Sequence, residues 1–280
     1  MRTGVFVAPF GELADVRVLA QIAADAEAAG WDGFFVWDHV QTHGSLEVAD
    51  PWIALTAVAL ATERATLGAL VTPLARRRPW DLARQIAVLD RLSGGRMVLG
   101  AGLGGDGRRE FSAFGEELDP KARARLLDEA LELIVELWRG EPVDHDGDAF
   151  HLAGAEVLPT PLQQPRPPVW LACRYPNKVP LRRAARYDGV FPISDDGPLG
   201  GAEVREILEV VAEHRAAGAG PFDVVITNHA PPDADRAAEL AGAGATWWLQ
   251  GFSDRPTLEG VRAAALNGPP QWTSAPSRKS

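Results

Sequence analysis

Residues Thr66–Gly104 read TLGALVTPLARRRPWDLARQIAVLDRLSGGRMVLGAGLG, and this stretch decides the fold. The apolar run Leu67–Val71 predicts a buried strand, and a second apolar run, Met97–Ala101, predicts another. Between them, Pro79–Leu92 predicts a helix, because apolar side chains recur at helical spacing at Leu82, Ile86, Leu89 and Leu92. Proline suits a first helical turn, where its missing N–H is not needed, and the Ser-Gly-Gly that follows ends the helix. The stretch therefore predicts one β-α-β unit.

The second of these strands ends in Gly100-Ala101-Gly102-Leu103-Gly104. Glycine lets a backbone approach a ligand closely, so we expect a ligand at this end. The run is a weak match to a nucleotide-binding fingerprint, because no acidic residue marks a ribose site. We interpret it as backbone that packs against a flat ring.

The rest of the chain continues the alternation of strands and helices. Further buried strands are predicted at Gly4–Ala8, Gly33–Trp37, Val169–Cys173, Gly189–Ile193, Asp223–Thr227 and Thr246–Leu249. Further helices are predicted at Val16–Ala29, Pro51–Thr62, Arg125–Trp138, Leu181–Ala185, Ala202–Ala217, Ala234–Ala241 and Pro256–Leu266. This α/β pattern favours a (β/α)8 TIM barrel, which typically takes about 250 residues, and a doubly wound parallel sheet is the alternative.

We expect one barrel domain at residues 1–268 and a flexible C-terminal tail at 269–280. Insertions are expected after the second and fourth strands, the latter at Gly102–Ala124, and before the fifth strand, where Glu141–Pro168 predicts a hairpin-like excursion. In a TIM barrel the active site lies at the C-terminal ends of the strands, so the residues there are the candidates for function.

The composition excludes several classes of protein. The 280 residues carry a net charge of −10, which argues against a nucleic-acid partner. A single cysteine, Cys173, excludes an intrachain disulfide framework and suits the reducing cytoplasm. No run reaches the length of a membrane span, and Met1 leads directly into a strand without a signal sequence. We therefore expect a soluble cytoplasmic protein with no membrane or nucleic-acid partner.

His39 is the candidate catalytic residue. It follows a strand directly, and the alternation of side chains along a strand places His39, Trp37 and Phe35 on the inner side. Asp38 then lies on the outer side, where it could cap a helix or pair with an arginine. Histidine suits proton transfer near neutral pH, while the simpler alternative is a histidine bonded to a loop carbonyl.

Two basic segments follow strands and could bind anions. Arg76-Arg77-Arg78 could reach an anionic substrate or cofactor tail, or could be solvated and paired with Asp81 or other acids. Arg174-Tyr175-Pro176-Asn177-Lys178 combines cations, an amide and a helix start, which suits a phosphate, and a plain basic loop is the equal alternative.

Two further features favour structural roles. His145, Asp146, Asp148 and His151 could be drawn as a metal cluster, but their spacing in a glycine-containing turn favours a surface hairpin, so no metal site is predicted. Cys173 has no base beside it in the sequence and is expected to be a small buried residue rather than a nucleophile.

Several of these motifs together resemble a known family. They are GWDG at 30–33 with Trp37-Asp38-His39, the whole stretch Thr66–Gly104, FSAFGE at 111–116, LWRGEPV at 137–143 and RAARYDGVFPI at 183–193. Over roughly residues 3–265 the chain resembles the luciferase-like monooxygenase family, whose TIM barrel binds FMN or the deazaflavin F420 across its mouth.

The resemblance implies a non-proline cis peptide near Leu70-Val71, forming a bulge behind the ring, and it places His39 near the reactive centre of a deazaflavin. The chain also departs from the family. The segment Ser194–Gly201 is short, so the lid of the larger members is largely missing. The glutamate that some deazaflavin enzymes carry after the fourth strand is absent here, since Gly102-Leu103-Gly104 is followed by Gly105-Asp106.

We therefore predict an oxidoreductase of the luciferase-like class that uses F420 or FMN, with F420 narrowly preferred because the Ala- and Arg-rich composition suggests a GC-rich genome. It would transfer hydride to or from a small organic substrate, with His39 moving the proton. The predicted cofactor contacts are Trp37, Asp38, Leu70, Val71, Gly100, Gly102, Leu103, Cys173, Arg174 and Asn177. A homodimer is also expected. The alternatives are a non-catalytic flavin-binding barrel and a cofactor-free hydrolase or isomerase that uses His39.

Overall fold

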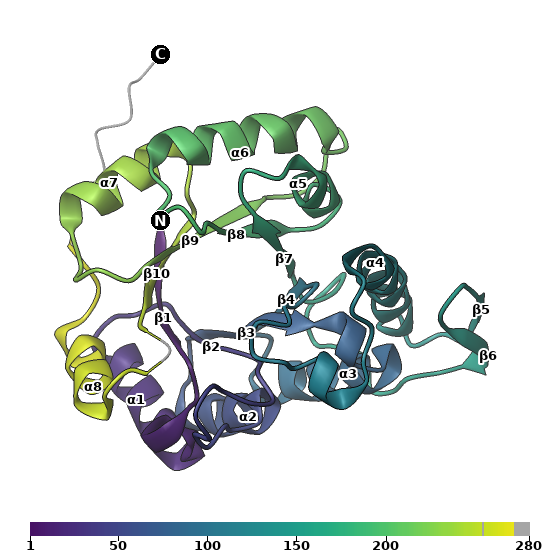
Figure 1. The fold of residues 1–280 in the computed structure, drawn as a ribbon, viewed down its shortest axis with the longest axis horizontal. Coiled ribbons are helices and arrows are strands. Elements are labelled where there is room, and N and C mark those ends of the chain that lie inside the picture. The colour runs from purple at the N-terminus through teal and green to yellow at the C-terminus, as the bar shows by residue number, and fades with distance from the viewer. Residues whose placement is uncertain (254, 272–280) are drawn as a thin grey trace.

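The computed structural model describes residues 1–253 and 255–271, and these form a closed barrel of parallel strands surrounded by helices (Figure 1). The barrel strands are β1 (Arg2–Val7), β2 (Gly33–Val36), β3 (Thr66–Pro73), β4 (Met97–Gly102), β7 (Val169–Arg174), β8 (Gly189–Ile193), β9 (Asp223–Asn228) and β10 (Trp247–Gly251). They pair in the order β1-β10-β9-β8-β7-β4-β3-β2, and β2 returns to β1. The predicted (β/α)8 barrel is confirmed, and closure rules out the open doubly wound sheet.

Eight α-helices lie on the outside of this barrel within the described ranges. They are α1 (Val16–Ala28), α2 (Pro51–Ala61), α3 (Pro79–Leu92), α4 (Pro120–Leu137), α5 (Lys178–Ala184), α6 (Gly201–His214), α7 (Ala234–Ala243) and α8 (Leu258–Asn267). Short 3-10 turns, η1 (Gly11–Ala14), η2 (Leu74–Arg76) and η3 (Ser112–Phe114), follow β1, β3 and β4. The bounds of α3 match the sequence prediction.

Capping residues correct two of the predicted helix starts. Helix α4 begins at Pro120 rather than Arg125, because the Asp119 carboxylate accepts hydrogen bonds from the N–H groups of Lys121 and Ala122. Helix α5 begins at Lys178 because Asn177 caps it in the same way. Leu92 was expected on the buried face of α3 but is 46% exposed, whereas Leu89 in the same turn is buried.

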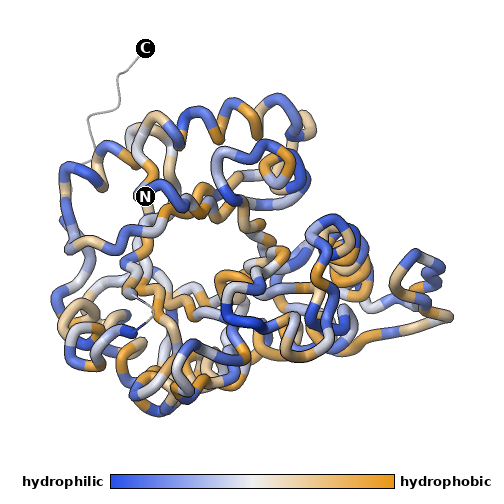
Figure 2. Tube along the Cα trace, viewed as in Figure 1, coloured by the Kyte–Doolittle hydropathy of each residue, from blue (hydrophilic) through white to orange (hydrophobic). Residues whose placement is uncertain are grey.

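The strands separate two apolar cores. Inside the barrel lies a cluster rich in aromatic rings, formed by Phe6, Phe35, Leu70, Val98, Trp170, Phe191, Val225, Trp247 and Leu249. The larger core lies between strands and helices, and hydrophilic residues concentrate on the outer faces of the helices (Figure 2). Phe35 is fully buried in the inner cluster, as the alternation along β2 predicts. The lower barrel is therefore filled, and a ligand site is left to its mouth.

Strands β3 and β4 meet in an irregular pairing. Their register shifts between Ala69 and Thr72, and the Leu70–Val71 peptide is cis, as the family resemblance implied. Opposite this bulge lies Gly100, where an added Cβ would stand 2.3 Å from the Ala69 carbonyl oxygen and 2.5 Å from Leu70 Cδ2. The position therefore excludes every side chain.

The insertions lie where the sequence predicts them. Strands β5 (Val143–Asp146) and β6 (His151–Ala155) form an antiparallel hairpin that projects beyond α4 (Figure 1). In it, His145 Nε2 lies 2.9 Å from Glu129 Oε1, and His151 Nδ1 lies 2.8 Å from Asp146 Oδ1. Over the described ranges no group of three His, Cys, Asp or Glu side chains is arranged to hold a metal ion.

No helix in the described part of the chain has the length and apolarity needed to span a membrane. Of the predicted tail at 269–280, residues 272–280 lie outside the described residues.

The bulge predicts a sharp difference between two glycines. Gly100→Ala should lower the free energy of unfolding by about 1–3 kcal/mol, because its new methyl group meets backbone atoms that cannot yield. Gly105→Ala should be nearly neutral, since an added Cβ there meets nothing within 4 Å. Urea denaturation of both variants measures the difference, and equal stabilities would contradict the close packing of β4 on the bulge.

Candidate active site

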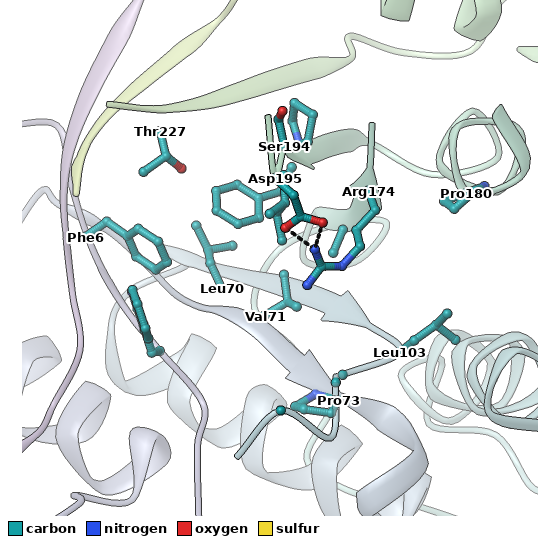
Figure 3. Close-up of a pocket in the computed structure, with 18 of the residues that line it drawn as sticks. Phe6, Leu70, Val71, Pro73, Leu103, Arg174, Pro180, Ser194, Asp195 and Thr227 are labelled. Atoms are coloured by element: carbon teal, nitrogen blue, oxygen red, sulfur yellow. Dashed lines mark hydrogen bonds and ion pairs between the residues drawn. The ribbon is translucent and has the colours of Figure 1, made fainter. Parts of the chain in front are cut away.

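A cavity of about 940 Å³ opens at the C-terminal ends of the barrel strands. Its floor is apolar and is formed by Phe6, Leu70, Val71, Phe191 and Ile193. Figure 3 shows Leu70 and Val71 at the centre of this floor, with Phe6 on one side and Leu103 on the other. The volume and the apolar floor with a few polar groups at its edge are typical of a small-molecule site.

The end of β2 delivers Trp37, Asp38 and His39 to the edge of the cavity. The ring of His39 packs against Trp37 and Phe10, with centroid distances of 5.6 Å to each. Trp37 Nε1 is buried at this edge and has no hydrogen-bond partner among the residues described. Trp37 thus offers an unused donor beside the histidine.

His39 pairs with Glu110, a residue that the sequence analysis did not single out. The distance from His39 Nδ1 to Glu110 Oε2 is 2.7 Å, and Glu110 is 3% exposed. The expected absence of a glutamate after the fourth strand is therefore wrong. Glu110 does not follow Gly104 directly but stands further along the same loop. An ionised carboxylate only accepts hydrogen bonds, so Nδ1 carries the proton of this contact, and in the neutral imidazole Nε2 is then the acceptor.

The loop after β4 is folded so as to present Glu110. Asp106 Oδ1 accepts hydrogen bonds from the N–H groups of Phe111, at 2.9 Å, and Ser112, at 3.0 Å. Gln41 Nε2, in the loop after β2, donates to the Arg108 carbonyl at 2.7 Å. These contacts join two insertions far apart in the sequence, and they hold Glu110 against His39.

Two of the three consecutive arginines complete a buried charged cluster. Arg77 Nη2 lies 2.7 Å from Asp38 Oδ2, and Arg76 Nη1 lies 3.3 Å from Glu110 Oε1. Asp38 thus pairs with an arginine, one of the two roles predicted for it. Asp81 pairs with Arg84 instead, at 3.2 Å. None of the three arginines lines the cavity, so the predicted role in binding an anionic ligand does not describe their contacts. The predicted role as a solvated run paired with Asp81 or other acids describes them only in part.

The two carboxylates of the cluster respond to their surroundings in opposite directions. Burial raises the pKa of Asp38 above its ordinary value, and the charges of Arg77 and Arg76 offset this only in part. Burial acts in the same direction on Glu110. There, however, the hydrogen bond and charge of His39, the Val40 N–H and the charge of Arg76 prevail, so the pKa of Glu110 lies below its ordinary value. Glu110 is therefore the ionised partner of His39 at neutral pH.

The opposite edge of the cavity is formed by the ends of β7, β8 and β9. Arg174 forms an ion pair with Asp195 over this edge (Figure 3). Asn177 lines the cavity, but its Oδ1 accepts the Val179 N–H at 3.0 Å as a helix cap. The predicted phosphate-binding loop is thus at the mouth, with its cation paired and its amide partly used.

The cavity lining separates the predicted contacts into two groups. Eight line it, namely Trp37, Asp38, His39, Leu70, Val71, Leu103, Arg174 and Asn177. Gly100 and Gly102 lie behind it, where they pack against the β3 bulge. Cys173 points into the outer core, its Sγ 3.4 Å from the Asn177 carbonyl oxygen, and burial raises its pKa to about 12. Cys173 is therefore the buried residue that the sequence favoured, and naming it as a cofactor contact conflicts with its position.

The fold and the cavity define a TIM barrel with an apolar, ligand-sized mouth and a histidine–carboxylate pair at its edge. A family model described as luciferase-like monooxygenase matches residues 1–279. The chain therefore belongs to the luciferase-like monooxygenase family.

Two curated relatives illustrate the range of similarity. An uncharacterized protein of Sinorhizobium fredii is 31% identical over 255 residues, covering 85% of this chain and 70% of that protein. An F420-dependent glucose-6-phosphate dehydrogenase of Gordonia bronchialis is 36% identical over 193 residues, covering 65% of this chain and 54% of that enzyme. The chain thus spans about half the length of that dehydrogenase.

Solved structures share the fold at low sequence identity. An F420-dependent secondary alcohol dehydrogenase, solved with an F420-acetone adduct, matches with a TM-score of 0.75 at 18% identity, over 95% of this chain and 98% of that one. The FMN complex of the oxygenating constituent of 3,6-diketocamphane monooxygenase from Pseudomonas putida matches with a TM-score of 0.68 at 20% identity, over 84% and 68% of the two chains.

The pKa of Glu110 predicts how its contribution to stability depends on pH. The lowered value means that Glu110 stabilises the folded state above its ordinary pKa of about 4.5, and that this stabilisation is lost as the pH falls through the folded value. Glu110→Gln should therefore cost about 1–3 kcal/mol at pH 7 and much less near pH 3. Urea denaturation of the variant and of the unaltered protein at both pH values measures this difference in the free energy of unfolding. Glu116→Gln, on the exposed part of the same loop, is the control, and a cost for Glu110→Gln that does not change with pH would contradict the ionised pair.

Proposed function

We propose that this protein is an oxidoreductase that binds a flavin-type cofactor over the Leu70–Val71 floor and uses His39 for proton transfer. The observation that carries the proposal is the His39–Glu110 pair, with its 2.7 Å contact, at the edge of a cavity of about 940 Å³. A histidine held by a carboxylate is suited to acid–base chemistry near neutral pH.

The residues present fit a tricyclic ring. Leu70, Val71 and Leu103 offer apolar contact, and Trp37 Nε1 is a buried donor without a described partner beside them. Gly104 lines the cavity with φ of 67°, and an added Cβ there would meet Pro73 and Phe111 at 2.8 and 2.9 Å. We infer that Trp37, Asp38, Leu70, Val71, Leu103, Arg174 and Asn177 hold the cofactor, with Gly100 and Gly102 behind the floor.

The bound cofactor would supply the redox chemistry, accepting or giving hydride in exchange with a small organic substrate. The chain would bind and orient both partners over an apolar surface that excludes water. His39 Nε2 would take a proton from the substrate or return it, while Glu110 holds Nδ1–H and stabilises the charged ring.

We prefer F420 to FMN, and FMN remains the second candidate cofactor. The Gordonia bronchialis relative is an F420-dependent enzyme, and the Ala- and Arg-rich composition favours the same choice. A homodimer, a cytoplasmic location and the absence of a nucleic-acid partner stay predictions of the sequence. The alternatives are a barrel that binds a flavin without turnover and a cofactor-free hydrolase or isomerase.

Cofactor titration tests the site itself. The purified protein should bind F420 or FMN tightly, with F420 favoured, as followed by quenching of cofactor fluorescence. Val71→Trp should weaken binding at least about tenfold by filling the floor of the cavity. The control is Val88→Trp, at a position that is 47% exposed on α3 and outside the cavity lining. Binding of neither cofactor would exclude both the oxidoreductase and the flavin-binding barrel.

His39→Ala separates catalysis from binding. Turnover should fall roughly 10²–10⁴-fold while cofactor affinity changes little, because the general acid–base is lost and the floor is kept. Loss of F420 absorbance with a panel of secondary alcohols and sugar phosphates, the substrate classes of the relatives, measures turnover. His145→Ala, on the projecting hairpin, is the matched control. Full turnover in His39→Ala would remove the proposed role of His39.

A further inference from the structure

The three consecutive arginines after β3 have three different surroundings. Arg77 donates from Nε at 3.1 Å and from Nη2 at 2.7 Å to the same oxygen of Asp38. Arg78 is exposed, and its Cζ lies 5.8 Å from the centroid of the Trp80 ring. Arg76 differs from both neighbours in that it contacts Glu110, the partner of His39.

Arg76 is held in one place from several sides. Its side chain is 7% exposed, and its Nη1 donates to Glu110 Oε1 at 3.3 Å. Its Nη2 donates to the Asp38 carbonyl at 3.3 Å, and its Cζ lies 5.5 Å from the centroid of the Phe111 ring. The guanidinium therefore bridges the end of β2 and the loop after β4, the two segments that carry His39 and Glu110.

The charges of this cluster balance. Asp38 and Glu110 contribute two negative charges when ionised, and Arg76 and Arg77 contribute two positive ones, so the cluster is neutral while His39 is neutral. Without Arg76, Asp38 would still be paired with Arg77, and the negative charge of Glu110 would be uncompensated in a buried site. An uncompensated carboxylate 2.7 Å from an imidazole favours the imidazolium.

We propose that Arg76 is a positioning residue for proton transfer: by engaging one oxygen of Glu110, it keeps His39 a neutral acceptor rather than an imidazolium locked to Glu110. This inference rests on the proposed function in so far as His39 moves the proton. The two arginines then differ in emphasis. Arg77 forms the shorter ion pair with Asp38, at 2.7 Å, whereas Arg76 lies 3.7 Å from Asp38 Oδ1 and also contacts Glu110.

Other titratable groups lie at this edge of the cavity and also affect the titration of His39. His43 and Arg108 line it, and Arg108 Cζ lies 5.9 Å from the centroid of the Phe10 ring that also packs on His39. Asp38 is a further acid close to the pair, and the charge of Asp50 acts on Asp38 in turn. None of these residues is changed in the variants below, so each variant retains their influence on the titration of His39.

The test is the titration of His39 in the protein without cofactor, followed by the ring-nitrogen signals in NMR of protein labelled at its six histidines. Comparison with His39→Gln assigns the signals. Arg76→Met should raise the titration midpoint of His39 by about one pH unit, because removal of a nearby positive charge favours the imidazolium. Arg76→Lys keeps the charge and should restore most of the original midpoint. Arg77→Met is the matched control and should shift the titration midpoint of His39 much less than Arg76→Met does.

Two results would overturn the proposal: a midpoint in Arg76→Met equal to that of the unaltered protein, or an equal shift in Arg77→Met. Arg76→Gln removes the same charge with a polar side chain and decides the matter if Arg76→Met does not fold. Because cofactor is left out, failure to bind F420 and FMN would remove the proposed function without touching these midpoints. Unchanged midpoints in a protein that binds cofactor would remove only the role of Arg76.

Discussion

The close approach of β4 to β3 is the constraint on which the site depends. Gly100 lies so near the Ala69 carbonyl and the Leu70 side chain that no Cβ fits between them. The register between the strands shifts at this point, and Leu70 and Val71 come to face the mouth of the barrel as its floor. Below them the aromatic cluster fills the barrel. Gly100 thus permits the β3 bulge, and this bulge lies between the packed interior of the barrel and the cavity at its mouth.

The insertions after β2 and β4 bring together the side chains at the edge of the cavity. His39 and Glu110 are 71 residues apart and follow strands that are not neighbours, since β3 lies between β2 and β4. They meet because the β4 loop folds back over the end of β3, where Asp106 fixes its turn and Arg76 lies beneath it. The barrel brings the strand ends to one rim, and the loops determine which side chains meet there.

Sequence patterns predict the parts of this molecule that are set by local chemistry. The apolar runs, the helix after Pro79 and the glycine-rich end of β4 all appear as predicted, and Phe35 lies inside the barrel as strand alternation requires. The alternation does not continue past the end of β2 at Val36, because Trp37, Asp38 and His39 all line the cavity. Glu110 was missed because its role depends on a loop conformation, which no periodicity encodes. The charged turn with Asp106 four residues before it was the available signal. The position of Arg174 at the mouth could be predicted from the sequence, but its pairing with Asp195, in the loop after β8, could not.

The cavity divides into regions with different physical tasks. Its floor is apolar and carries no charged side chain, whereas its β2–β4 edge concentrates two carboxylates, two guanidinium groups and an imidazole in a small buried volume. Each of those carboxylates and guanidinium groups has an oppositely charged neighbour, so little reorganisation would accompany a proton transfer there. A neutral cluster around His39 can accept a proton and release it, while a cluster with an excess negative charge would bind that proton more strongly. The arrangement of charges, rather than the histidine alone, is what makes this edge suited to acid–base chemistry.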